Sequence, residues 1–190
     1  RYDAHFLRLF ALALEKSGDP YDLFEACQLW EDFQKKAVEE GWFPPDGPEC
    51  ATLDLHMAQL LARLENYPHV AEDFRNSLSD GGPRNKAPNS DELFPWTAEQ
   101  LYQRACRIDP HREAYQAWLD WARKQTDWKR AEEAAQAWCQ ALPDDVRPWL
   151  FLMESAEKRG ALQKAFAFME KAERADAVNS DVRRARLRLL

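Results

Sequence analysis

Residues 112–145 read REAYQAWLDWARKQTDWKRAEEAAQAWCQALPDD, and residues 146–177 read VRPWLFLMESAEKRGALQKAFAFMEKAERADA. A shift of 34 residues lays the first segment onto the second with related residue types at matching positions. The matched pairs are Tyr115 with Trp149, Trp118 with Leu152, Ala122 with Ala156, Thr126 with Gly160, Trp128 with Leu162, Ala131 with Ala165, and Ala135 with Met169. A period of this length is typical of helix-turn-helix units that stack because no single unit can bury its apolar face alone.

The apolar residues of each copy follow a helical spacing. Tyr115, Trp118 and Ala122 recur at steps of three and four residues, so they share one helical face. Ala131 and Ala135 fall on the next helix, where short side chains let two backbones approach and tryptophan rings fill the remaining space. The predicted core consists of Tyr115, Trp118, Ala122, Ala131, Trp138, Trp149, Leu152, Ala156, Ala165 and Met169.

This pattern resembles the tetratricopeptide repeat over residues 98–177. The first copy offers Tyr115, Trp118, Leu119, Ala122, Ala131, Ala135, Trp138 and Pro143 at the positions of the family pattern, and the second offers Trp149, Leu152, Met153, Ala156, Ala165, Met169, Ala172 and Ala177. Upstream, Ala98, Tyr102, Ala105 and Pro110 are similar to the second helix of a preceding unit. Leu119, Met153 and Ala177 depart from the pattern and indicate a divergent member. The resemblance implies an all-α fold, a right-handed α-solenoid of antiparallel helix pairs with about ten helices.

The rest of the chain shows helical periodicity interrupted by two proline-rich and glycine-rich breaks. Helices are expected over 2–16, 20–40, 50–65, 67–78, 98–108, 111–125, 127–142, 145–159, 161–175 and from 179 or 180 to the end. We expect three parts: divergent helical pairs over 1–78, a long loop or insertion over 79–96, and repeats with a terminal capping or truncated helix over 97–190. The first helix is expected to face inward with Phe6, Leu9, Phe10, Ala13 and Leu14. The apolar loop residues Leu93, Phe94 and Trp96 either fold back onto the array or form a docking surface.

Composition and cysteine usage indicate a folded protein of the cytoplasm. No stretch approaches 18 consecutive apolar residues, so no membrane span is expected. The cysteines Cys27, Cys50, Cys106 and Cys139 show no paired spacing and are expected to be reduced thiols in the core. The chain begins without Met and ends inside an apolar helical pattern, so we expect a region of a larger multidomain protein.

The sequence contains no motif that indicates an enzyme, a cofactor site or a metal site. The phosphate-binding glycine loops, the nucleophile elbow and the H-E-x-x-H pattern are all absent. His5, His56, His69 and His111 lie in separate segments, and His56 is expected to be a hydrogen-bonded packing residue. Adjacent carboxylates such as Glu132 and Glu133 point about 100° apart on a helix and do not converge on one substrate atom. A non-catalytic role without a cofactor is therefore predicted.

The predicted partner is a protein segment, extended or helical. In arrays of the resembled family, ligands lie along the face of the first helices of the repeats, which here carries Glu113, Gln116, Asp120, Arg123, Lys124, Arg147, Leu150, Glu154, Glu157 and Lys158. The family's receptors for peptide carboxyl termini have Lys and Asn where this chain has Gln116 and Asp120, so that specificity is not expected. The same face could instead pack on a neighbouring part of a longer polypeptide.

Two other functions stay open from the sequence. The array could regulate an attached or associated enzyme, such as a protease or another effector. The last helix carries Arg183, Arg184, Arg186 and Arg188 and could contact nucleic acid, although its cations also suit a solvated helix end. Residues 19–100 carry 17 acidic and 6 basic side chains, and this balance disfavours nucleic-acid binding there.

Overall fold

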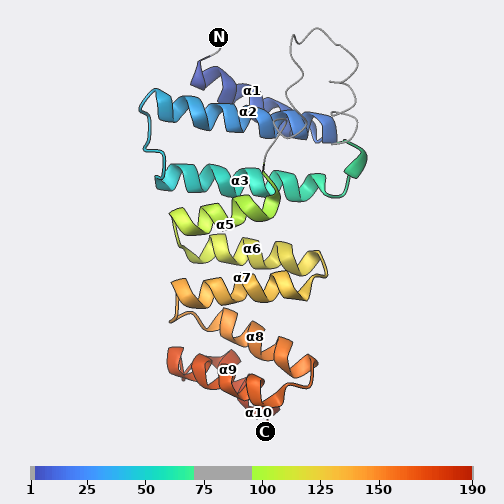
Figure 1. Ribbon diagram of the computed structural model, residues 1–190, viewed down its shortest axis with the longest axis vertical. Helices are drawn as coiled ribbons and strands as arrows, with labels where there is room; N and C mark the ends of the chain where they lie inside the picture. The colour runs from blue at the N-terminus through green and yellow to red at the C-terminus, as the bar shows by residue number, and fades with distance from the viewer. Residues whose placement is uncertain (1–2, 71–95, 190) are drawn as a thin grey trace. The chain divides into compact units, whose positions relative to one another are not determined.

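The computed structural model describes residues 3–70 and 96–189, and all regular secondary structure within them is helical (Figure 1). The predicted all-α class is confirmed, and each helix begins and ends within two residues of its expected bounds. The chain divides into two compact units, Arg1–Asp109 and Pro110–Leu190. Residues 71–95 lie outside the description, and with them lie most of the helix expected over 67–78 and nearly all of the loop expected over 79–96.

The first unit is a stack of helices that pack in chain order, α1 on α2, α2 on α3 and α3 on α5. Their bounds are α1 Ala4–Ser17, α2 Pro20–Glu39, α3 Pro48–Leu64 and α5 Ala98–Ile108, and residues 68–70 are also helical. The expected division placed α5 with the C-terminal repeats. In the structure α5 packs on α3 and belongs to the first unit.

Local sequence signals set the ends of these helices. Gly18 adopts a left-handed conformation with φ of 73° and ends α1. The Asp19 carboxylate then accepts hydrogen bonds from the backbone N–H groups at the start of α2, where Pro20 is the first residue. Thr97 and Gln100 form a capping box at the start of α5, with each side chain bonded to the backbone of the other.

The expected inward face of α1 is wrong. Ala4, Leu7 and Ala11 are the buried residues of this helix, whereas Phe6, Leu9 and Phe10 are 44%, 54% and 40% exposed. Two apolar rows compete on α1, and the row with the small alanines lies against α2. The reason is geometric, because short side chains let the two helix backbones approach closely, as Ala26 and Ala37 do on α2.

A buried polar network joins three helices of the first unit. Asp54 on α3 is fully buried, and its Oδ1 accepts a hydrogen bond of 3.0 Å from Gln34 Nε2 on α2. Its other oxygen lies 3.1 Å from Nε of Arg104 on α5, in an ion pair whose alignment is not that of a hydrogen bond. The Arg104 guanidinium also lies 5.2 Å from the centre of the Trp96 ring. Burial raises the pKa of Asp54, although Gln34 and Arg104 act in the opposite direction. The ion pair that joins α3 to α5 therefore contains a carboxylate that loses its hydration when the chain folds.

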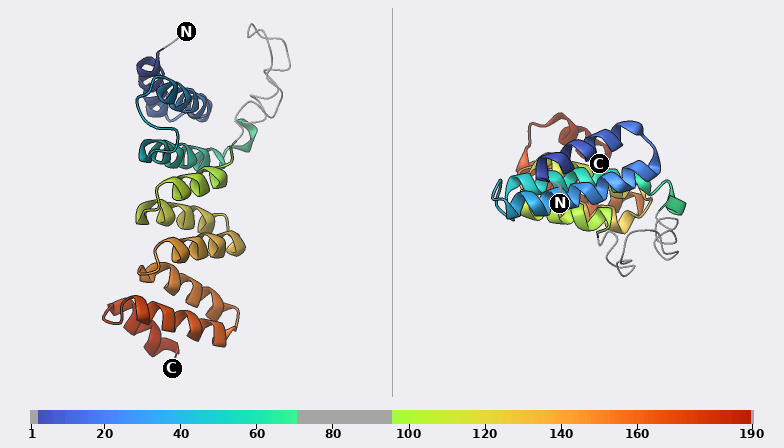
Figure 2. Two further views of the ribbon diagram at one scale, coloured as in Figure 1. Left: turned by 60° about the vertical axis from the view of Figure 1, so that its left-hand side comes forward. Right: turned by 90° about the horizontal axis from the view of Figure 1, so that it is seen from above.

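The second unit consists of two helical hairpins and a final helix. The bounds are α6 Arg112–Lys124, α7 Trp128–Ala141, α8 Val146–Lys158, α9 Leu162–Ala175 and α10 Ser180–Leu189. First helices begin at residues 112 and 146 and second helices at 128 and 162, so each element recurs after 34 residues. Each helix packs on the next, and α10 packs on both α8 and α9 (Figures 1 and 2).

Large aromatic residues and alanines fill this unit. Tyr115 and Trp138 stack at 6.2 Å between ring centres, and Trp138 is fully buried. Trp149 is half-buried and packs against the core of the second hairpin. Its indole N–H donates to the carbonyl oxygen of Pro143, in the connection between α7 and α8. The remaining residues of the predicted core are all 6% exposed or less: Tyr115, Trp118, Ala122, Ala131, Leu152, Ala156, Ala165 and Met169.

One ion pair joins the two hairpins at their first helices. Asp145 caps α8 and also pairs with Arg112 at the start of α6, where Nε and Oδ2 lie 2.8 Å apart. This contact joins the start of one hairpin to the start of the next.

The turn inside each hairpin contains a residue in the left-handed conformation. The second turn uses Gly160 with φ of 72°, whereas the first uses Thr126 with φ of 57°. A β-branched residue is strained in this conformation.

Candidate functional site

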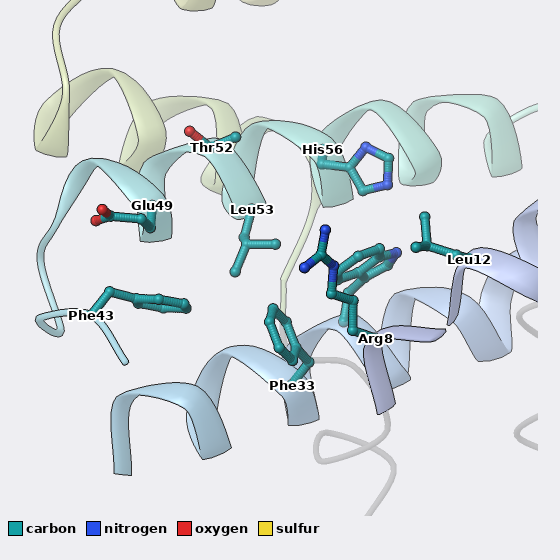
Figure 3. Close-up of a pocket in the computed structure, with 9 residues that line it drawn as sticks. Arg8, Leu12, Phe33, Phe43, Glu49, Thr52, Leu53 and His56 are labelled. Atoms are coloured by element: carbon teal, nitrogen blue, oxygen red, sulfur yellow. The ribbon is translucent and has the colours of Figure 1, made fainter. Parts of the chain in front are cut away.

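The first unit has a surface slot of about 410 Å³ with a mostly apolar lining (Figure 3). We name it the α1–α3 slot because it is bounded by α1, α2, α3 and the connection between α2 and α3. The residues that line it are Arg8, Leu12, Trp30, Phe33, Phe43, Glu49, Thr52, Leu53 and His56. Its volume lies in the lower part of the range of pockets that hold small ligands or single side chains, about 300 to 1,000 Å³.

Packed aromatic rings form the floor of the slot. Trp30 and Phe33 on α2 are 5% and 6% exposed and meet edge to face at 5.6 Å between ring centres. Phe43 comes from the connection after α2 and packs edge to face on Phe33 at 6.4 Å. Aromatic rings held in this way present a fixed apolar surface that loses little conformational entropy when a ligand binds.

A polar network holds Trp30 in place behind the slot. The Trp30 indole N–H donates to Oε1 of Glu15 on α1, and Nε2 of His56 on α3 lies 2.9 Å from the same oxygen. The His56 ring also contacts Trp30 edge to face at 5.3 Å. The network therefore joins α1, α2 and α3. It places His56 in the hydrogen-bonded packing role that its sequence context indicates.

Two side chains of opposite charge border the slot. In Figure 3, Phe43 and Glu49 lie at one end and Leu12 and His56 at the other, and the guanidinium of Arg8 lies between Leu53 and His56. Arg8 and Glu49 are both exposed, and neither makes a hydrogen bond or ion pair with any residue of the described ranges 3–70 and 96–189. Both charges are therefore available to a ligand that occupies the slot.

The predicted partner face of the second unit is largely engaged in contacts within that unit. On α6, Gln116 donates to Asp120 at 3.0 Å, and Arg123 lies 3.8 Å from the same carboxylate. The Arg123 guanidinium also lies 5.9 Å from the centre of the Phe151 ring. Glu113 borders a shallow hollow beside the Arg112–Asp145 pair, and Lys124 is exposed.

On α8, the predicted face is covered in part by α10. Arg188 on α10 lies 2.8 Å from the carboxylate of Glu157 and 3.7 Å from that of Glu154. Leu150 is partly buried against the core that includes Val182 and Ala185 of α10. Lys158 lies outside this contact, with Nζ 4.8 Å from the centre of the Trp128 ring, and Arg147 is exposed. The α8 half of the face therefore already has an occupant.

The arginines of α10 have partners of their own. Arg184 pairs with Asp181, Arg186 with Glu173 on α9 at 2.6 Å, and Arg188 with the α8 carboxylates. Arg183 Nε lies 3.4 Å from the carbonyl oxygen of Ala177. These ion pairs compensate the positive charge of α10 and weaken it as a binding surface for phosphate groups.

The four cysteines are free thiols inside the helical packing. Burial raises the pKa of Cys27, Cys106 and Cys139 to about 12 and also raises that of Cys50. Such thiols are protonated near neutral pH and are poor nucleophiles.

Neither a metal cluster nor a membrane helix is found in the described part of the chain. No group of three or more His, Cys, Asp or Glu side chains there could hold a metal ion. No helix in the same residues has the length and hydrophobicity needed to cross a bilayer.

Comparisons with known proteins add little to this description. No protein-family model matches the sequence, and no curated protein matches it. Among solved structures, the chain is similar to one named "MamA RS-1 ArsTM double mutant", with a TM-score of 0.45 and 17% sequence identity over 94% of this chain and 78% of that one. A similarity this low carries no argument about the fold, which follows from the helices and hairpins described above.

Proposed function

We propose that this chain is a non-catalytic helical-repeat scaffold of the tetratricopeptide type that binds a segment of another protein through the α1–α3 slot. The observation that carries the proposal is an aromatic-floored hollow at the surface of the first unit, bordered by Arg8 and Glu49, which have no partner among the described residues. Buried aromatic anchors supply much of the binding energy in protein interfaces, and complementary charges at the rim supply specificity.

The chemistry of the slot supports binding more than catalysis. His56 lines the slot and contacts Glu15 and the Trp30 ring, so it serves to fix the floor. Most of the remaining lining is aromatic or aliphatic carbon. A catalytic site needs a nucleophile or a proton-transfer group directed at the reacting atom, and the slot directs apolar surface at its occupant.

The predicted face on α6 and α8 stays a second proposed contact surface for the same function. Its α6 half, with Gln116 and Asp120, is open to a partner, whereas its α8 half is paired with α10. A partner that binds along both helices must therefore displace Arg188 from Glu157. This displacement makes the slot the better first candidate.

The test is selection of a library of random short peptides on the intact chain. The proposal predicts enriched peptides that lose binding to Leu53→Glu, which places a charge in the slot, and keep binding to Glu154→Arg on α8. Circular dichroism must show the same helix content in both variants. Failure to enrich any peptide, or enrichment that Leu53→Glu leaves intact, rejects the slot as the binding site.

A further inference from the structure

The charges around the α1–α3 slot specify the kind of segment that fits it. Glu49 lies at one end of an apolar floor and Arg8 lies beyond Leu53 from it, and neither has a partner among the residues that the structure describes. An exposed charge without a partner at the rim of an apolar hollow is positioned to select the charge of its occupant.

We propose that the slot binds a short protein segment with the order cation, apolar anchor, anion. The inference rests on the proposed function and names the chemistry of its partner. A lysine or arginine of the segment contacts Glu49, an aromatic or branched aliphatic side chain lies on Phe33 and Phe43 beside Leu53, and an aspartate or glutamate contacts Arg8.

The position of each group supports this order. Glu49 lies in the first turn of α3, where a negative side chain interacts favourably with the helix N-terminus. Phe33 is almost fully buried and gives the anchor a fixed surface, and Phe43 and Leu53 are half-buried beside it. Arg8 comes from α1, and its guanidinium lies between Leu53 and His56, on the side of Leu53 away from Glu49.

The surrounding field favours the cationic end of the segment. Residues 3–70 carry 13 Asp or Glu side chains against 5 Lys or Arg, a formal balance of −8. A field of this sign steers a basic group toward the unit at long range and repels an acidic one. Arg8 is one of the few cations of the unit, so we expect the acidic residue of the segment to contact Arg8.

The experiment uses three fluorescent peptides with the intact chain and fluorescence anisotropy at about 0.15 M salt, where the long-range attraction of the acidic unit for a cationic peptide is largely screened. Their central residue is Phe, and the flanking charges are Lys and Glu, Lys and Lys, or Gln and Gln. The Lys–Phe–Glu peptide is expected to bind most tightly. Its advantage over Lys–Phe–Lys is about 2-fold to 30-fold, since an exposed ion pair changes an affinity by about 1.4-fold to 5-fold and the alternative replaces that attraction by a repulsion of similar size.

Charge reversal at the rim provides the decisive comparison. Arg8→Glu should make Lys–Phe–Lys the preferred peptide. Lys16→Glu is the matched control, because it makes the same change of net charge on α1 at an exposed residue outside the slot lining and should leave the original order unchanged. Leu53→Glu should remove binding of all three peptides.

Three results would overturn the inference. They are equal binding of the three peptides, an unchanged order in Arg8→Glu, and a reversal that Lys16→Glu produces equally well. If none of the three peptides binds while the selected library peptides still require Leu53, the proposed charge order is wrong and the binding function stands. If the library also enriches nothing, both proposals fail.

Discussion

Replacing Thr126 by Gly should stabilise the second unit. Thr126 holds φ of 57° in the turn between α6 and α7, where the equivalent residue of the next hairpin is Gly160 with φ of 72°. A left-handed conformation costs an L-residue about 1 to 2 kcal/mol, and glycine loses about 0.5 to 1 kcal/mol more chain entropy on folding, which leaves a net gain of about 0.5 to 1 kcal/mol. The Thr126 side chain is exposed, so its removal sacrifices no packing.

Urea unfolding followed by tryptophan fluorescence measures this gain as a higher midpoint at unchanged slope. Thr126→Ala is the first control and should gain little, because alanine suffers the same backbone strain. Gly160→Ala is the second, and should lose about 1 kcal/mol for backbone reasons alone, since a Cβ there meets no atom within 4 Å. A lower midpoint for Thr126→Gly, or no loss for Gly160→Ala, would refute the reasoning.

Three further predictions test the packing and the buried polar network. Trp138→Ala should lower the free energy of unfolding by about 3 to 5 kcal/mol in chemical denaturation, because the ring is fully buried against Tyr115. Leu9→Lys should change it by less than about 0.5 kcal/mol, since Leu9 lies on the exposed face of α1; a large loss would restore the inward face expected from the sequence. Burial raises the pKa of Asp54, so the folded state binds the proton of this carboxyl group more tightly than the unfolded chain does. The stability that this proton contributes is therefore present at acid pH and is lost as the pH rises through the folded pKa. Relative to the native chain, Asp54→Asn should therefore become more stable from acid to neutral pH, and a pH-independent difference between the two chains would contradict the raised pKa.

The sequence predicts the second unit well because its repeat is local. Each hairpin needs only residues within one period, and helices at 112, 128, 146 and 162 follow from spacing, caps and turn residues. The caps at Asp19 and Thr97 were equally predictable, since a capping side chain and its backbone partner lie within three residues.

The slot could not be predicted because its parts are distant in the sequence. Arg8, Phe33 and His56 meet only after three helices pack, and periodicity says nothing about such a meeting. The inward face of α1 failed for a related reason, since hydrophobicity ranks Phe6 above Ala4 although close helix packing favours the smaller residue. The pairing of Arg188 with Glu157 likewise depends on where α10 docks.

The proposed function requires that a partner segment occupies the α1–α3 slot. Methyl NMR spectra of the intact chain, recorded with a library-selected peptide, test this directly because Leu12 and Leu53 line the slot and Leu150 lies on the face of α8. We predict that the methyl signals of Leu12 and Leu53 shift with the peptide and that those of Leu150 do not. Shifts at Leu150 with unchanged signals at Leu12 and Leu53 would contradict the account and place the partner on the second unit.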